Sequence, residues 1–289
     1  MIADDHMKNL SDKDIKEIKK WLNIDTYRQF ENISLERLYL ELVMRSLFFS
    51  SDHSDYDRWV VKTYANSLFS GDPFLITDSH MNQLKTKARL LVSPYFSVTT
   101  TGRVAHLCFE GMKKSLFGWN NVDDYWIDEK VDELPVAEAM PILCEHRVMI
   151  EINLTSGSDE EIAESLKAML PQWRKIRKIE PESLDTIRFG HSTIKKIIDY
   201  RLIPLLDILT WAKHHDIRVS DNHLSSLLHC DSDEENKTRM GSHIKNTDKP
   251  LALKTASKSF ILQFHHFLNK NNHLKEMRVS DVITLADKD

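Results

Sequence analysis

The stretch Tyr200–Lys258, YRLIPLLDILTWAKHHDIRVSDNHLSSLLHCDSDEENKTRMGSHIKNTDKPLALKTASK, decides what fold this chain is expected to adopt. Apolar residues recur at three- and four-residue spacings over positions 194–212, which is typical of an amphipathic helix. Pro204 falls inside that run, where it removes a backbone donor and crowds the preceding turn. The helix is therefore expected either to kink there or to begin again with Pro204 in its first turn.

The rest of this stretch predicts more short helices. Ser220 is a candidate N-cap for a brief helix, and a basic helix is expected to begin near Asp233 and to end before Lys249-Pro250. A long final helix is expected to follow, with Leu253–Phe267 supplying its apolar face. Two short helices across a tight turn, followed by a basic one, suggest a helix-turn-helix unit. An ordinary helical core with a solvated basic side has the same pattern.

Charge is unevenly distributed along the chain. Between Asn236 and Arg278 there are nine Lys or Arg against two acids, a net +7, whereas the whole chain carries −5 and the remainder therefore −12. Such asymmetry is typical of a surface that faces a polyanion. One helical turn separates Lys254 from Lys258, which predicts a shared face. The candidate nucleic-acid-binding residues are Lys237, Arg239, Lys245, Asn246, Lys249, Lys254 and Lys258. Arg239 and Asn246 are the better candidates for reading base edges.

Composition places the chain among ordinary folded proteins. Of its 289 residues, 41% are hydrophobic and 29% are charged, and only seven are glycine, which favours helices over a loop-rich all-β fold. The three cysteines are far apart and form no CxxC pair, which is typical of a reducing compartment. The N-terminus is polar and unlike a signal peptide, and no apolar run is long enough to span a bilayer. We expect a cytoplasmic protein without membrane contact.

Helices are expected before residue 70. Ser11 and Ser34 stand as N-caps directly before apolar periodic runs, and a third run covers Trp59–Phe69 before the turn signal SGDP at residues 70–73. Further along, Ser158 and Glu161 fit a capping box that begins another amphipathic helix.

Strands are expected in the centre of the chain. The candidate runs are Phe74–Ile76, Leu90–Val98, Val104–Phe109 and Arg147–Leu154. Val148–Leu154 alternates most clearly between apolar and polar residues, and a hairpin is expected around Thr101-Gly102.

The expected fold is therefore α+β and predominantly α-helical, with a small central β-sheet and a C-terminal helical, helix-turn-helix-like region. Residues 178–192, which include Pro181 and Gly190, form the best candidate linker. They divide the chain into an N-terminal helical plus small-sheet α+β domain (1–180) and a C-terminal helical domain (190–289) with the candidate helix-turn-helix.

Three blocks of the sequence carry a resemblance to a known family: WLNIDTYRQFENISLERLYLELVMRSLFF (21–49), IEINLTSGSDEEIAESLKAMLPQWRK (150–175), and RLIPLLDILTWAKHHDIRVSDNHLSSLL with KNTDKPLA (201–228 and 245–252). Together they resemble a bacterial family of unknown function that is usually encoded on integrative elements and genomic islands. The second block is similar to that family's strand, acidic cap and helix ending in Arg. The third is similar to its Leu-Asp-Leu-x-Trp helix, turn and Thr-x-x-Pro-Leu-Ala element. In the first block, the matching residues are Trp21, Asp25, Tyr27, Leu35, Arg45 and Leu47-Phe48.

The resemblance covers about half of the chain, and its motifs look structural. Pro171 and His229 depart from it, because the family's middle block has no proline and a Phe-Pro commonly closes its short helix. The family carries no established activity, so the resemblance implies a mobile-element context and no catalytic residue.

The sequence lacks the common motifs of enzymatic chemistry. The sequence contains no GxxxxGK[ST], GxGxxG, HExxH or GxSxG, so we expect no catalytic, cofactor-binding or metal-binding residues. Asp233 with Glu235-x-Lys237 has the carboxylates and lysine of a restriction-type nuclease, which would need a divalent ion. Those folds place the triplet on a strand, whereas here it lies at a predicted helix start, and Glu17-x-Lys19 shows how easily the triplet arises.

Histidines and aromatic residues leave two alternatives open. Imidazole is a good zinc ligand, but surface or phosphate-facing positions are the commoner role. The histidines near the candidate segment are His214, His215, His223, His229, His265, His266 and His273. Trp119, Tyr125 and Trp126 lie among acids and could serve a partner surface, although core or loop packing is commoner.

The leading hypothesis is a non-enzymatic, DNA-associated accessory or regulatory protein of a bacterial mobile element, which binds double-stranded DNA through its basic C-terminal helices. The competing hypothesis is a protein–protein interaction module in a defence, immunity or toxin-antitoxin-like system, acting through the acidic N-terminal half. A metal-dependent nuclease comes third.

Overall fold

The computed structural model describes residues 7–49, 55–86, 95–96, 98–121, 124–144, 146–181, 189–229 and 239–286. It divides into two compact units, one formed by Met1–Arg89 with Asp185–Asp289 and the other by Leu90–Leu184. We call them unit 1 and unit 2. This grouping differs from the sequence-based division near residues 180–190, because the first helices of the chain pack onto the C-terminal ones.

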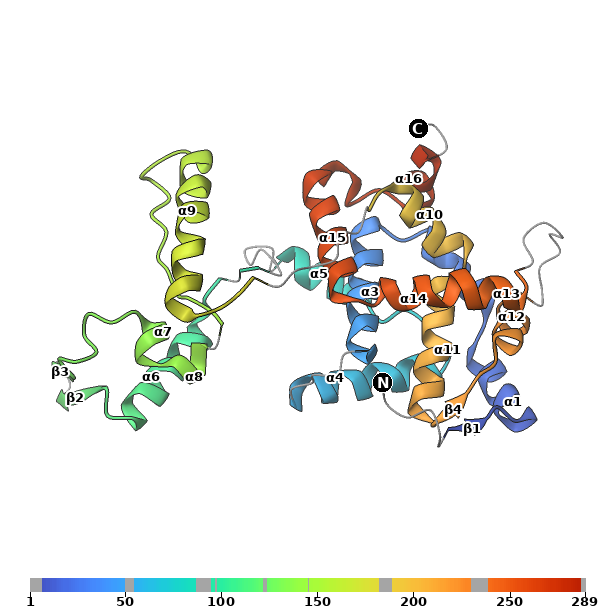
Figure 1. The fold of residues 1–289 in the computed structure, drawn as a ribbon, viewed down its shortest axis with the longest axis horizontal. Helices are drawn as coiled ribbons and strands as arrows, with labels where there is room; N and C mark the ends of the chain where they lie inside the picture. The colour runs from blue at the N-terminus through green and yellow to red at the C-terminus, as the bar shows by residue number, and fades with distance from the viewer. Residues whose placement is uncertain are drawn as a thin grey trace. The chain divides into compact units, whose positions relative to one another are not determined.

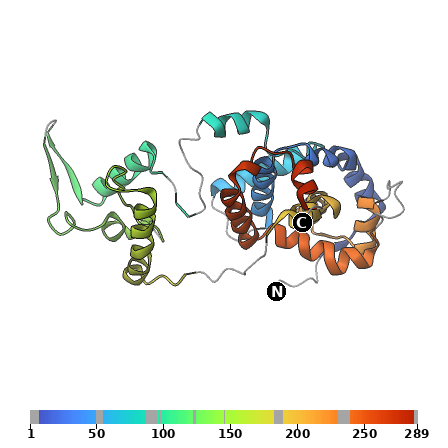
Figure 2. The same ribbon diagram turned by 90° about the horizontal axis from the view of Figure 1, so that it is seen from above.

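Unit 1 is almost entirely helical (Figures 1 and 2). Its elements are β1 (Lys8–Asn9), α1 (Asp12–Trp21), α2 (Ile24–Arg28), η2 (Gln29–Glu31), α3 (Leu35–Phe49), α4 (Asp55–Phe69), α5 (Asp78–Thr86), α10 (His191–Asp199), α11 (Leu202–His214), β4 (Ile217–Arg218), α12 (Asp221–His229), α13 (Gly241–His243), η4 (Ile244–Asp248), α14 (Lys249–Thr255), α15 (Lys258–Lys270), η5 (Asn272–Leu274) and α16 (Val279–Ala286). Unit 2 contains α6 (Thr101–Lys113), β2 (Phe117–Asn121), β3 (Asp124–Ile127), α7 (Val136–Ala139), α8 (Pro141–Cys144) and α9 (Asp159–Arg177). The expectation of an α+β, predominantly helical chain is confirmed.

Helix α11 is the centre of unit 1. It is buried on nearly every side, which explains why its apolar residues are so dense. The helical backbone is interrupted before α11 at Arg201, whose φ of 52° lies in the left-handed region. Pro204 then lies in the first turn of the new helix. A missing N–H is tolerated there because the first turn has no intrahelical acceptor for it. Of the two expectations for Pro204, a new helix is the correct one.

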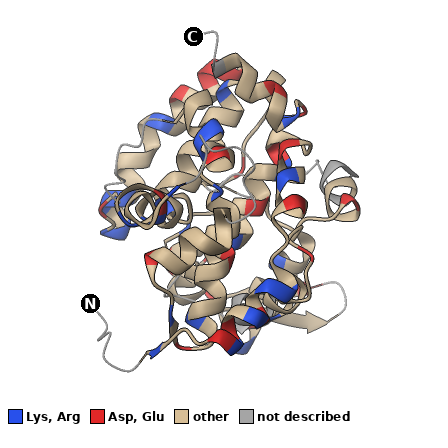
Figure 3. Ribbon diagram, turned by 90° about the vertical axis from the view of Figure 1, so that its right-hand side faces the viewer, with Lys and Arg blue, Asp and Glu red and all other residues tan. Residues whose placement is uncertain are grey.

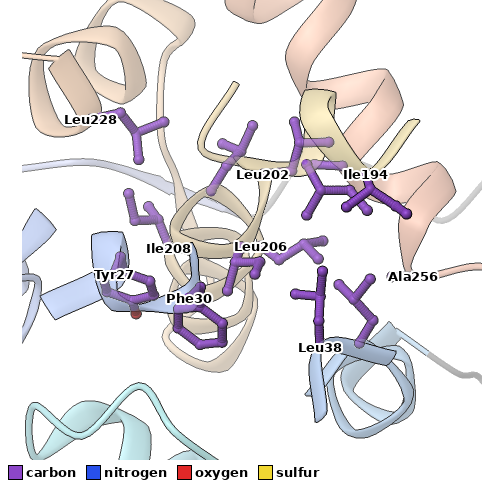
Figure 4. Close-up of a cluster of buried hydrophobic side chains, with 14 of the residues drawn as sticks. Tyr27, Phe30, Leu38, Ile194, Leu202, Leu206, Ile208, Leu228 and Ala256 are labelled. Atoms are coloured by element: carbon purple, nitrogen blue, oxygen red, sulfur yellow. The ribbon is translucent and has the colours of Figure 1, made fainter. Parts of the chain in front are cut away.

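The core is assembled around α11. Figure 4 shows Leu206 and Ile208 of that helix close to Tyr27 and Phe30, which come from α2 and η2, with Leu38 of α3 nearby. Full burial of a side chain of this size contributes about 1.5–3 kcal/mol relative to exposure. Segments near the two ends of the sequence thus share one core.

The sheets are small and differ from those expected. β1 pairs with β4 in parallel, which ties the N-terminus to the connection between α11 and α12. β2 and β3 form an antiparallel hairpin in which Gly118 faces Trp126. The sheet of unit 2 does lie within residues 74–154, but it uses other residues than those expected.

The expected strands are wrong wherever the structure describes them. Phe74–Ile76 is irregular, and Val148–Leu154 forms no strand, with Leu154 already in a turn. Val104–Phe109 and the expected hairpin at Thr101-Gly102 belong to α6 instead. Thr100 caps that helix by accepting a hydrogen bond from the Arg103 N–H, and this local bond outweighs the strand propensity of the segment. Leu90–Val98 lies largely outside the described residues.

Ser11, Ser34 and Ser158 cap helices as predicted. Ser11 and Asp14 form a capping box on α1, and Ser158 and Glu161 form one on α9. Ser34 accepts from the Arg37 N–H at the start of α3. Within the described parts of the chain, no helix is both long and apolar enough to cross a membrane.

Candidate nucleic-acid interface and buried ion cluster

The basic helix predicted to end before Lys249-Pro250 continues instead to Thr255, through α13, η4 and α14. The turn Ile244–Asp248 is π-helical. In a regular α-helix the Pro250 ring would crowd the carbonyl four residues earlier, and the wider turn before it accommodates both the ring and the missing N–H. π-helical turns are rare and are frequently found at functional sites.

This helix has one buried and one solvent-facing side. The buried side carries Ile244, Asp248, Ala252 and Thr255. Among the candidate residues, Lys245, Asn246 and Lys254 are exposed and Lys249 is half-buried. The cationic groups are therefore placed on the outer side of η4 and α14, where a polyanion could reach them.

The half-buried Arg239 side chain is bound by other groups of the protein. Its guanidinium donates to both carboxylate oxygens of buried Asp248, at 2.7 and 2.6 Å, and stacks 3.9 Å from the centre of the Tyr200 ring. The hydrogen bonds to Asp248 raise the pKa of Arg239. The bidentate fork that a guanine edge would need is thus occupied, which leaves Asn246 as the exposed candidate for a base contact.

Lys254 and Lys258 do not lie on one helix. α14 ends at Thr255, the backbone is extended at Ser257, and α15 begins at Lys258 with the Ser257 hydroxyl accepting from the Phe260 N–H. The expected shared helical face is therefore wrong, because a serine cap interrupts the periodic pattern. Lys258 is exposed at the start of its own helix. Lys237 lies outside the described residues, as does the expected helix start near Asp233.

The helix-turn-helix pattern has an unusual connection. Residues 215–220 join α11 to α12 and include β4 and Asp216, whose φ of 53° is left-handed. A helix-turn-helix typically uses a turn of about three or four residues, so this one is longer. In Figure 3, blue Lys and Arg segments alternate with red Asp and Glu segments on the side shown. Positive charge therefore does not cover that whole side.

A buried ion cluster, which the sequence analysis did not predict, lies beside α11. The Arg45 guanidinium donates to both oxygens of Asp207, at 2.8 and 2.9 Å, and to Glu41 at 2.7 Å. It also donates to the carbonyls of Glu41 and Pro73, so all five of its N–H groups have acceptors. The Tyr27 hydroxyl donates to Asp207 at 2.8 Å.

Burial sets the protonation of this cluster. Burial raises the pKa of Glu41 and of Asp207, and the Arg45 charge opposes that rise. Burial works to lower the pKa of Arg45, but the two carboxylates outweigh it and raise that pKa. Burial and the Asp207 charge raise the pKa of Tyr27 well above its ordinary value, so the hydroxyl remains a donor.

The cluster holds elements together. Glu41 accepts from the backbone N–H groups of Leu75 at 3.1 Å and Ile76 at 2.9 Å, which fixes the irregular segment after α4 against α3. Arg45 and Asp207 join α3 to α11, and the side chains of Arg45, Glu41 and Asp207 are fully buried. A closed cluster of this kind serves structure, because a substrate could not reach it.

The histidines and acids of the described residues do not cluster as metal ligands. Among the described residues, no group of three or more His, Cys, Asp or Glu could hold a metal ion. His215 stacks on Trp211, and His229 is buried at the end of α12. The nuclease-like triplet Asp233, Glu235 and Lys237 falls outside the described residues.

Comparison with known proteins gives one result. The model of a family of unknown function, DUF6387, matches residues 14–265. The chain belongs to this family. No curated protein and no solved structure matches it significantly.

The DUF6387 match spans both compact units and includes η4 and α14. It confirms that the resemblance noted in the sequence is to a family without an assigned function. Tyr27 and Arg45, two of the residues that carry that resemblance, meet in the buried cluster with the aspartate of the third block, Asp207. This part of the resemblance is thus explained by the architecture of unit 1.

Proposed function

We propose that this protein is a non-enzymatic, DNA-associated accessory or regulatory protein whose nucleic-acid contact is the outer side of η4 and α14. The observation that carries the proposal is the exposure of Lys245, Asn246 and Lys254 on the solvent-facing side of the helix formed by η4 and α14. The acid of this helix, Asp248, is buried and neutralised by Arg239, so it does not cancel the outward charge.

The chemistry of these groups favours contact with phosphate. A lysine ammonium is a compact point charge that binds phosphate oxygens without reading sequence. An exposed Asn246 could add a bidentate contact to an adenine edge, since its amide offers both a donor and an acceptor. Binding driven mainly by lysine releases counterions and therefore weakens steeply as salt rises.

The test compares two double variants that change the net charge equally. Lys245→Ala with Lys254→Ala should weaken binding to double-stranded DNA of any sequence and reduce the salt slope by about two, one for each lost contact. Lys16→Ala with Lys20→Ala, both exposed on α1, is the matched control and should leave binding unchanged. Fluorescence anisotropy over a salt series measures both quantities. Equal losses in the two variants, or no binding by the wild type at low salt, would overturn the proposal.

A second candidate function is protein–protein interaction, and a separate observation favours it. The hairpin of unit 2 exposes large aromatic side chains, with Trp119 and Tyr125 each 68% accessible. Trp and Tyr are enriched in interface centres because they bury much area at little entropic cost. Replacing both residues by Ser should abolish binding of a protein partner to this hairpin without affecting DNA binding.

A further inference from the structure

Residues 241–255 (α13, η4 and α14) form one continuous helix, here called the contact helix, and its π-helical turn changes which side each lysine faces. The Lys249 N–H donates to the Ile244 carbonyl, five residues earlier instead of four. Lys245 and Lys254 are nine positions apart, so in an uninterrupted α-helix they would lie about 180° apart, on opposite sides. One extra residue in the turn reduces the rotation between them by up to about 100°. The turn therefore brings Lys254 toward the side of Lys245.

A π-helical turn is rare, and here an arginine fork braces it. Asp248 is the last residue of the turn, and its side chain is buried. Arg239, which precedes the contact helix, donates to both of its carboxylate oxygens, at 2.7 and 2.6 Å. The same guanidinium lies 3.9 Å from the centre of the Tyr200 ring, at the end of α10. The end of the turn is thus tied to the segment before the helix and to a neighbouring helix.

The start of the contact helix is itself fixed on α12. The Ser225 hydroxyl donates to the Arg239 carbonyl at 2.6 Å. A Cβ on Gly241 would lie 2.1 Å from the side-chain oxygen of Asn222 and 3.2 Å from its backbone nitrogen, so the two helices approach too closely for a side chain there. Arg239 therefore holds the turn from an anchored position.

Lysine could not replace Arg239 in this brace. Only a planar guanidinium offers two parallel N–H groups to one carboxylate, and it also stacks on an aromatic ring more readily than an ammonium does. Lysine at this position would keep the charge but lose the fork that fixes the direction of Asp248. The geometry, and not the charge alone, is what the turn requires.

We propose that Arg239 is a positioning residue of the DNA interface. Through Asp248 it holds the π-helical turn, and the turn presents Lys245 and Lys254 to the same stretch of DNA backbone. Arg239 acts in this way without touching DNA. This inference rests on the proposed function and adds what orients the contact helix.

Arg239→Lys tests the role of the fork. It should reduce the salt slope of binding to double-stranded DNA by about one, because the two lysines no longer reach phosphates together. Arg45→Lys is the matched control, since it breaks a second arginine–aspartate fork of unit 1, between α3 and α11. It should lower the urea midpoint and leave the salt slope unchanged. Fluorescence anisotropy over a salt series measures the slope, and far-ultraviolet circular dichroism verifies that each variant is folded.

Deletion of Thr247 tests the turn without removing any contact group. Thr247 is an exposed residue of the turn, and its deletion takes out the extra residue while every lysine remains. The salt slope should again fall by about one, as Lys254 rotates away from Lys245. Thr247→Ala keeps the length of the turn and is the control, with an unchanged slope.

Hydrogen exchange of the free protein reads the turn independently of DNA. In Arg239→Lys the Lys249 amide should exchange about tenfold faster or more, because hydrogen bonds to a charged group no longer oppose opening of the turn. No DNA binding by the wild type overturns the proposed function. Wild-type binding whose slope either Arg239→Lys or the deletion leaves unchanged overturns this inference alone. An unchanged Lys249 exchange rate, or an equal loss of slope in Arg45→Lys, has the same consequence.

Discussion

Replacing Arg45 by Met tests whether the buried ion cluster stabilises unit 1. The substitution keeps an apolar stem of similar length and removes five donated hydrogen bonds. Glu41 and Asp207 would then be left fully buried without their cation. Breaking a buried pair by removing one partner typically costs about 3–5 kcal/mol, since the remaining charge is uncompensated.

That cost is large for a protein of ordinary stability, which unfolds at about 5–15 kcal/mol. Urea unfolding followed by far-ultraviolet circular dichroism should therefore show a midpoint lower by about 1–2.5 M, for a slope near 2–3 kcal/mol/M. Arg28→Met is the matched control, because Arg28 pairs with Asp25 at 3.2 Å on the surface, with side chains 56% and 82% accessible. Surface pairs contribute about 0–1 kcal/mol.

The variant also makes a prediction about pH. Without Arg45, the pKa values of Glu41 and Asp207 should rise further, since the charge that opposed burial is gone. A carboxyl whose folded pKa lies above its unfolded pKa stabilises at low pH, and that stability is lost as pH rises through the folded value. The deficit of Arg45→Met should thus shrink between about pH 8 and about pH 5. A cost equal to that of Arg28→Met, or a deficit independent of pH, would refute the reasoning.

Two other predictions concern separate parts of the chain. Burial, with the charges of Arg201 and Arg239, lowers the pKa of His229 to about 4. The neutral imidazole therefore contributes stability above pH 6.5, and this stability is lost as pH falls toward 4. The loss amounts to about 2 kcal/mol once the shift is reduced for solvent screening. His229→Gln should flatten this part of the plot of urea midpoint against pH. Gly111→Ala should destabilise unit 2 by about 1–3 kcal/mol, because its Cβ would lie 2.4 Å from the Phe117 ring. Gly102→Ala in the same helix meets no atom within 4 Å and should be neutral or stabilising, as amide hydrogen exchange of β2 and α6 would show.

The sequence by itself determined the elements whose cause is local. Capping boxes at Ser11 and Ser158 set the starts of two helices, since both partners of each bond lie within three residues. The dense apolar pattern of α11 identified the central helix, and Pro204 marked its first turn. Exposed lysines on η4 and α14 were also foreseeable, because they alternate with the apolar side of a helix.

Tertiary structure alone decided everything that needs a distant partner. Val148–Leu154 has the alternation of a strand, but pairing requires a neighbouring strand, and none is supplied among the described residues. Arg45 and Asp207 are 162 positions apart, and no local pattern says that α3 and α11 meet. Whether a charged side chain is a surface group or part of a buried cluster depends on what covers it. For that reason Arg239, which the sequence analysis predicted to contact DNA, is bound to Asp248 instead.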